Sequence, residues 1–185
     1  MTTTQSTPRN RLEYESRFLK SVSDRIKNDN GAKADFKRAL SCEPEHIRKV
    51  YPVVLPYVGN TSEWEQTKIW IPVACLSVYY PSTQQKGNFG HSCRGLATAT
   101  NSEGADRRFR TLLDLTLTDI QSPLTALVRQ MKSKGIAINY PQLLADLRQW
   151  EHPNQYIQDR WARAFWGAPP SSLDESEPAA DDIAE

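Results

Sequence analysis

Apolar residues recur at helical spacing along almost the whole chain, and this pattern constrains the fold more than any other feature of the sequence. Apolar residues three or four positions apart lie on one face of an α-helix, whereas a half-buried strand alternates apolar and polar residues. No segment shows sustained alternation flanked by hairpin turns. The sequence therefore predicts an all-α protein of about eight to nine helices.

Prolines, glycines and capping residues place the ends of several helices. Pro44 is suited to the first turn of a helix, and Gly135 is a typical helix stop. Asn139 and either Thr61 or Ser62 are suitable N-caps. The predicted helices cover residues 11–26, 32–40, 44–51, 62–80 with a kink at Pro72, 91–100, 104–117, 122–134, 139–150 and 154–167.

A polar stretch that contains glycine, PSTQQKGNFG at 81–90, separates two groups of predicted helices. Such a composition between periodic segments is typical of a linker. We therefore expect two small helical lobes, an N-terminal lobe over residues 9–83 and a C-terminal bundle over residues 88–167.

The end of the chain is strongly acidic. Residues 171–185 carry six acidic residues and no basic one, which leaves 16 acidic against 23 basic residues, a net charge of +7, in residues 1–170. Self-repelling charge with few apolar side chains is typical of disorder, so we expect residues 168–185 to form a disordered acidic tail. A basic body is compatible with a polyanion site that the tail screens, and equally with a tail that only aids solubility.

Residues 102–113, SEGADRRFRTLL, combine three arginines with a strong apolar face. At 100° per residue, one face of the predicted helix consists of Phe109, Leu112, Leu113, Thr116 and Leu117. Arg107 then points away from the core, and Arg108 and Arg110 flank its edge. This helix is either an ordinary solvated surface or a surface that contacts phosphate.

Basic residues recur on the outer faces of successive predicted helices. Arginine offers a planar pair of donors suited to phosphate oxygens, and a helix N-terminus after a glycine adds backbone donors. Because no groove-reading motif accompanies them, we expect contacts to the nucleic-acid backbone and not to base sequence. The candidate nucleic-acid-binding residues are Lys37, Arg38, Arg94, Arg107, Arg108, Arg110, Arg129, Lys132 and Lys134. The alternative is that half of them only pair with nearby acids.

Motifs for catalysis are weak. Gly90-His91-Ser92 is similar to part of a hydrolase nucleophile elbow, which needs a strand before the serine and a glycine two residues after it. A polar linker precedes this serine, and Arg94 stands at the position of the second glycine. The chain has only three histidines to serve as a base. We therefore expect a protein that is not an enzyme.

Metal and cofactor motifs are missing too. Cys42 and His46 lie four residues apart, and His91 and Cys93 two apart, but no Cys-x-x-Cys pair completes a tetrahedral set. The sequence contains no Walker-type loop and no His-Glu-x-x-His. It therefore predicts neither a metal site nor a cofactor.

The cysteines and the apolar stretches bear on the compartment. Cys42, Cys75 and Cys93 are odd in number and far apart, and the first ten residues lack the apolar region of a secretory signal. We expect reduced thiols that mostly fill the core. The longest apolar stretch, residues 69–80, is too short to span a bilayer and contains a proline. These features predict a cytoplasmic protein without membrane contact.

Four segments of the C-terminal half follow one another in a distinctive order: GNFGHSCRGLA, EGADRRFRTLLD, INYPQLLADLRQW and DRWARAFWG. This order resembles the CasB family, the small subunit of the type I-E CRISPR effector complex, Cascade. The matching residues are Gly90, Arg94 and Leu96, then Asp106, Arg107, Arg108 and Phe109, then the helix from Asn139 to Trp150.

The N-terminal half resembles the family more loosely. The segment FKRALSCEPEHIRKVYPVVLPYVG is similar to the family's basic pair, turn and tyrosine-proline segment, and it carries the basic pair onto Lys37 and Arg38. Asn139 and Tyr140 stand where the family has Asp-Trp, and we expect them still to cap and to fill the core. The acidic tail is an addition, so the resemblance covers residues 11–167.

The resemblance implies an all-helical subunit without enzymatic activity that sits as a pair along the belly of the effector complex. There it would contact the other effector subunits, the CRISPR guide RNA, the target DNA strand and the displaced DNA strand through a basic surface. Guide pairing, not this chain, would then supply sequence specificity. Two other functions stay open: a helical adaptor that binds only protein, and a small hydrolase that uses His91 and Ser92.

Overall fold

A computed structural model describes residues 12–84, 86–101 and 103–167, and the structural statements below concern these residues. They are mostly helical and contain no strand, although an isolated parallel bridge pairs Thr83 with Ile138. The prediction of an all-α fold is therefore confirmed. The predicted acidic tail, residues 168–185, lies outside the described residues. No helix in the described ranges is long and apolar enough to cross a bilayer.

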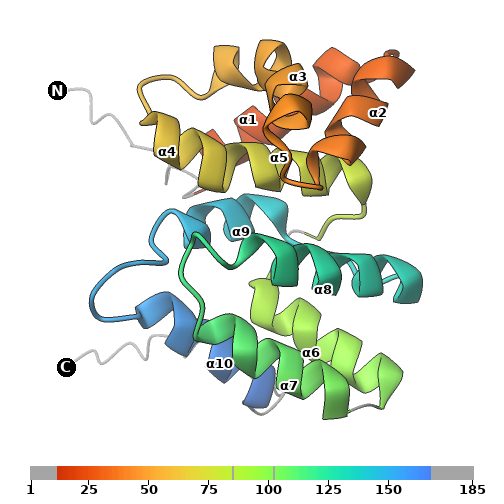
Figure 1. Cartoon of the computed structure of the whole chain (residues 1–185). Helices are drawn as coiled ribbons and strands as arrows, with labels where there is room; N and C mark the ends of the chain where they lie inside the picture. The colour runs from red at the N-terminus through yellow and green to blue at the C-terminus, as the bar shows by residue number, and fades with distance from the viewer. Residues whose placement is uncertain (1–11, 85, 102, 168–185) are drawn as a thin grey trace, which may run out of the picture.

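In Figure 1 the helices α1 to α5 form an upper group and α6, α7 and α10 form a lower group, with α8 and α9 between them. Both α8 and α9 contact α5 of the upper group, and α9 also contacts α1. The boundary between two lobes stays a prediction. The helices are α1 (Glu13–Ile26), α2 (Asn30–Ala39), α3 (Pro44–Val54), α4 (Glu63–Glu65), α5 (Ile71–Tyr79), α6 (Phe89–Thr100), α7 (Glu103–Leu113), α8 (Gln121–Lys134), α9 (Tyr140–Leu147) and α10 (Tyr156–Trp166).

The predicted caps are present. The Ser62 hydroxyl accepts from the backbone N–H of Glu65 at 3.1 Å, and Asn139 Oδ1 accepts from that of Gln142 at 3.1 Å. Gly135 ends α8 with a φ of +68°, a conformation that glycine adopts without strain. These three ends depend on local chemistry, which is why the sequence predicts them.

The helix predicted over residues 62–80 is interrupted. A π-helical turn, Gln66–Trp70, joins α4 to α5, and the N–H of Ile71 donates to the carbonyl of Gln66, five residues earlier. Pro72 follows and has no N–H to offer the preceding turn. The extra residue of the π turn rotates the residues before it, so Trp64 is 46% exposed, whereas Trp70 is fully buried.

The arginine-rich helix is shorter than predicted. It ends at Leu113 and not at residue 117, and the N–H of Leu115 turns back to the carbonyl of Leu112. The hydroxyl of Thr116 donates to Asp119 at 3.1 Å in the following turn, so Thr116 is exposed. Threonine and aspartate favour such local bonds over a continued helix. Phe109 is buried as predicted.

Arg148, at the end of α9, links α9 to the upper group through two ion pairs. Its Nη1 donates to Glu15 of α1 and its Nε to Glu65 of α4, both at 3.0 Å. Its guanidinium lies 5.2 Å from the ring centroid of Trp70, and the indole N–H of Trp70 donates to the same Glu65 oxygen at 3.0 Å. Glu15 is only 6% exposed, so Arg148 compensates a carboxylate that would be costly to bury alone.

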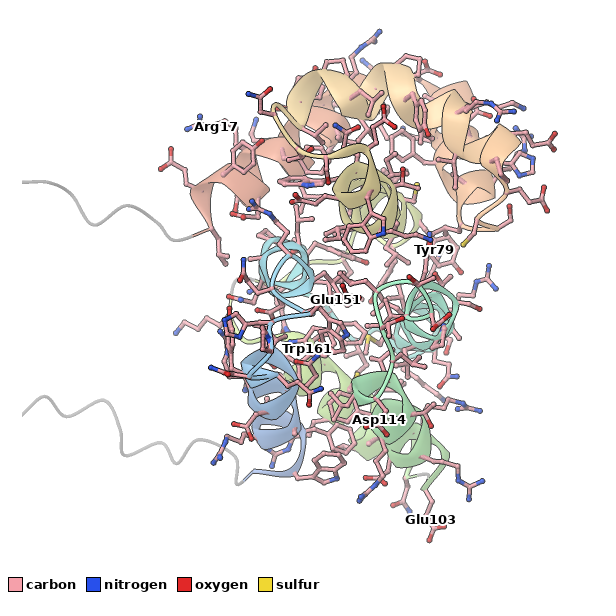
Figure 2. All side chains as sticks on the ribbon, turned by 60° about the vertical axis from the view of Figure 1, so that its left-hand side comes forward. Arg17, Tyr79, Glu103, Asp114, Glu151 and Trp161 are labelled. Atoms are coloured by element: carbon pink, nitrogen blue, oxygen red, sulfur yellow. The ribbon has the colours of Figure 1, made fainter. Side chains whose placement is uncertain are left out.

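The aromatic core of the lower group contains Trp150 and Trp161, both fully buried. Their ring centroids are 4.8 Å apart, and Figure 2 shows Trp161 pointing from α10 into the interior. The indole N–H of Trp161 donates to Asp146 at 2.6 Å, and that of Trp150 to the carbonyl of Leu115 at 2.8 Å. Both indoles therefore bury their area without leaving the N–H unsatisfied.

The three cysteines are free, as predicted. Cys75 and Cys93 are buried, and burial raises the pKa of both thiols. Cys42 is half-buried, and burial raises the pKa of its thiol too. All three thiols are therefore protonated at neutral pH.

Candidate nucleic-acid interface

The arginines of α7 point in three directions because successive residues of a helix are about 100° apart. Arg107 is exposed opposite the buried face and makes no ion pair with any described residue. Arg108 lies on the flank toward α8, where its Nη1 donates to Gln130 Oε1 at 3.2 Å. Arg110 lies on the opposite flank, toward the end of α10. The buried face itself consists of Ala105, Phe109 and Leu112.

Arg110 is held by two groups of its own chain. Its Nε donates to Asp106 Oδ2 at 2.6 Å, and its guanidinium carbon lies 4.7 Å from the ring centroid of Trp166. The indole N–H of Trp166 donates to the other oxygen of Asp106 at 2.8 Å. The hydrogen bonds from Arg110 and Trp166 lower the pKa of Asp106, so the carboxylate stays charged and opposes the charge of Arg110.

The three basic residues of α8 also differ in their surroundings. The ammonium group of Lys132 donates to the carbonyl of Tyr79 at 3.1 Å and lies 4.0 Å from the centroid of its ring. Figure 2 shows Tyr79 between α5 and α8, so Lys132 links the two helices. Arg129 and Lys134 are exposed and form no ion pair within the described ranges. Lys134 follows Gln130 by one helical turn and therefore lies on the same flank, toward α7.

The remaining candidates lie on other helices. Arg94 is half-buried on α6. Lys37 and Arg38 are exposed near the end of α2, where Arg38 pairs with Asp35 at 3.2 Å. Figure 1 places α2 at the top of the molecule and α7 at the bottom, so this pair is far from the arginines of α7.

The structure therefore brings together only part of the predicted set. Arg108 of α7 meets Gln130 of α8, and Lys134 lies one helical turn beyond Gln130. We call these two exposed basic residues, together with the exposed neighbouring Arg107, the α7–α8 basic face. Arg110 and Lys132 already have partners within the chain. The Lys37–Arg38 pair forms a separate basic site on the upper group.

His91 and Ser92 do not form a base and a nucleophile. Ser92 is only 2% exposed, and its hydroxyl donates to the carbonyl of Ala137 at 2.9 Å. The ring Nδ1 of His91 accepts from the backbone N–H of Asn88 at 3.1 Å, as part of the capping box that begins α6. Both residues lie in a helix with separate partners, which does not favour the hydrolase alternative.

Sequence analysis missed a groove between α1, residues 81–84 and the start of α9, with a volume of about 660 Å³. Lys20, Lys27 and Lys33 line it among apolar side chains, and none of its described lining residues is acidic. However, Lys20 pairs with Asp24 at 2.8 Å, and the ammonium of Lys33 donates to the carbonyl of Lys27 at 2.6 Å. The groove is therefore a weaker candidate for binding phosphate than the α7–α8 basic face.

Sequence analysis also missed Trp166, although a signal was available. The buried stripe of α10 runs through Ile157, Trp161 and Phe165, and Trp166 follows Phe165 by 100°, away from that stripe. The structure leaves Trp166 44% exposed beside Arg110.

Comparisons with known proteins agree with this architecture. The family model described as CRISPR-associated protein Cse2 matches residues 32–166. A relative from Thermus thermophilus, named CRISPR-associated protein Cse2, is 29% identical over 140 residues, which are 74% of this chain and 79% of the relative.

Two solved structures extend the likeness to the fold. The crystal structure of CasB from Thermus thermophilus is similar with a TM-score of 0.70 and 26% identity, covering 83% of this chain and 98% of that one. A chain of a structure named CRISPR RNA-guided surveillance complex, pre-nicking, has a TM-score of 0.71 at 21% identity, covering 83% of this chain and 92% of its own length. At that identity the second likeness concerns the fold alone.

Proposed function

Since this chain belongs to the CRISPR-associated Cse2 family, which includes CasB, we propose that it is the small, non-catalytic subunit of an RNA-guided surveillance complex. In this role it binds the backbone of the guide RNA, of the target DNA strand and of the displaced strand in the cytoplasm. Its partners are the other effector subunits and a second copy of itself. The similarity in fold to a chain of a surveillance complex supports such an assembly.

The α7–α8 basic face is the observation that carries the proposal. Arg107 and Lys134 are exposed without an acidic partner among the described residues, and Gln130 holds Arg108 in place without neutralising it. Residues 1–170 carry a net charge of +7, which favours polyanions near this part of the chain, while the six acidic residues of 171–185 bring the whole chain to +1. Phosphate oxygens fit the planar donors of arginine, so this face binds backbone without regard to sequence.

The geometry around His91 and Ser92 supports a role without catalysis. A buried hydroxyl that is bonded to a backbone carbonyl is not available to attack a substrate. Base pairing between guide and target then supplies specificity, and this subunit stabilises the paired and displaced strands.

The test compares the triple variant Arg107→Ala, Arg108→Ala, Lys134→Ala with a control of equal charge change, Arg17→Ala, Arg25→Ala, Lys49→Ala. The control residues are exposed on α1 and α3, and one of them, Arg17, pairs with Glu13. Fluorescence anisotropy with a labelled single-stranded oligonucleotide measures affinity over a range of salt concentrations. Each phosphate contact that is lost should flatten the slope of log affinity against log salt by about 0.7.

We expect the triple variant to bind more weakly and with a flatter slope than the control. Equal affinities and equal salt slopes for the two variants would overturn the assignment of this face. Co-expression with the other effector subunits and guide RNA tests the assembly. A chain that co-purifies with them but binds no single strand would be a protein adaptor instead.

A further inference from the structure

Trp166, the last residue of α10, exposes a large aromatic ring next to the arginines of α7. Its exposed fraction is 44%, whereas Trp70, Trp150 and Trp161 are fully buried. Burial in the core of the lower group therefore does not explain why a tryptophan stands at this position. Tryptophan is enriched among the residues that carry the binding energy of interfaces.

The ring of Trp166 is held in one orientation. Its N–H donates to Asp106 Oδ1 at 2.8 Å, and the guanidinium carbon of Arg110 lies 4.7 Å from its centroid. Phe165 and Phe109 support it with ring centroids 5.0 Å and 5.4 Å away, at steep angles. A ligand that stacks here would not have to order the ring first, which lowers the entropic cost of binding.

The charge of Arg110 is already opposed by Asp106, so this group is better suited to stacking than to holding a phosphate. Its side chain is nevertheless 63% exposed, beside the ring of Trp166, which is itself 44% exposed. Bases of single strands stack on aromatic rings and on arginine planes.

The neighbouring residue for a phosphate is Arg107. It precedes Arg110 by three positions, so the two side chains start about 5–6 Å apart on the helix surface. One nucleotide can therefore reach both, with its phosphate on Arg107 and its base over Arg110 and Trp166.

We propose that Trp166 and Arg110 form a stacking platform for one base of a single-stranded nucleic acid, with the adjacent phosphate on Arg107. This inference rests on the proposed function and deepens it. It adds a base contact that depends on stacking and not on charge, and it would be tolerant of sequence because every base has an aromatic face.

The experiment uses Trp166→Leu, with Trp64→Leu as the matched control, since Trp64 is 46% exposed on α4 in the upper group. The probes are a single-stranded oligothymidine and an abasic oligonucleotide of the same length, measured over a range of salt concentrations. Trp166→Phe keeps an aromatic face and serves as a second variant if the leucine variant is unstable. Oligothymidine should also quench the tryptophan fluorescence of the wild-type protein.

For Trp166→Leu we expect about 5- to 150-fold weaker binding of oligothymidine, unchanged affinity for the abasic probe and an unchanged salt slope. The quenching should disappear in this variant and persist in Trp64→Leu. Trp166→Phe should retain part of the affinity. Unchanged affinity and quenching in Trp166→Leu would overturn the platform. Weaker binding by the triple variant of Arg107, Arg108 and Lys134 would in that case still support the proposed function. A wild-type protein that binds neither probe at low salt would overturn both.

Discussion

Gly90 on α6 lies directly against the backbone of Trp161 on α10. A Cβ at position 90 would overlap the carbonyl oxygen of Trp161 and lie 2.9 Å from its carbonyl carbon. In the sequence this glycine is similar to part of a catalytic elbow, but in the structure it allows two helices to approach closely. Because the obstacle is backbone, it cannot move aside as a flexible side chain can.

The first prediction is that Gly90→Ala lowers stability by about 1–3 kcal/mol, since the added carbon forces the helices apart. Gly95→Ala, on the same helix, is the control. Its Cβ would meet Ile136 Cγ2 at 3.4 Å, an ordinary contact, and alanine favours the helix by about 1 kcal/mol over glycine. The thermal midpoint should therefore fall below that of the wild type in Gly90→Ala and rise above it in Gly95→Ala. A similar midpoint for both variants would contradict this packing.

The second prediction concerns Trp161, which is buried and bonded to Asp146. Trp161→Ala should cost about 3–5 kcal/mol of unfolding free energy, as large-to-small changes in a core do. Trp64→Ala, at an exposed position, should cost far less. Urea unfolding measures both variants. A Trp161→Ala protein of normal stability that lost only nucleic-acid binding would show that the indole is a ligand contact.

The third prediction is a pH dependence from His91. Partial burial and then the charge of Arg94 lower the pKa of His91 below its ordinary value of 6.5. The unfolded chain therefore binds this proton at a higher pH than the folded chain does. The free energy of unfolding falls as the pH drops below about 6.5, and this histidine lowers it no further below the pKa of the folded state.

His91→Gln should reduce this loss of stability, because glutamine completes a capping box without titrating. Thermal midpoints at several pH values between 7.5 and 5 measure the effect. The low pKa of Asp106 acts at more acidic pH, so it does not mask the result. An identical decline of the thermal midpoint with falling pH in the wild type and in His91→Gln would rule out this histidine as the cause.

The fourth prediction separates Lys132 from Lys134, which lie on the same helix. Lys132→Ala removes the bond to the Tyr79 carbonyl and the contact with its ring, so it should cost about 1–2 kcal/mol of stability with little effect on oligonucleotide affinity. Lys134→Ala should leave stability unchanged and weaken binding. Urea unfolding and anisotropy on both variants measure the two effects, and the reverse pattern would contradict the assignment.

The sequence by itself determined the helices and the sides that they bury. Phe109 and Trp161 are buried because apolar spacing within one helix is a local property, and Asn139 caps α9 through a residue three positions away. Sequence patterns did not predict the places where backbone N–H groups leave the regular α-helical hydrogen bonds. The π turn before Pro72 and the early end of α7 are such cases.

Only the tertiary structure decided which basic residues have partners within the chain. Each of Arg107 and Arg110 follows an acidic residue by four positions, but only Arg110 is bonded to its acid, Asp106, and contacts Trp166, which is 56 positions away; Arg107 makes no ion pair with any described residue. Likewise, Lys132 finds Tyr79 53 positions earlier, while Lys134 does not. Helical periodicity places a side chain on a face of its own helix, but the partner that it meets there depends on how distant helices pack.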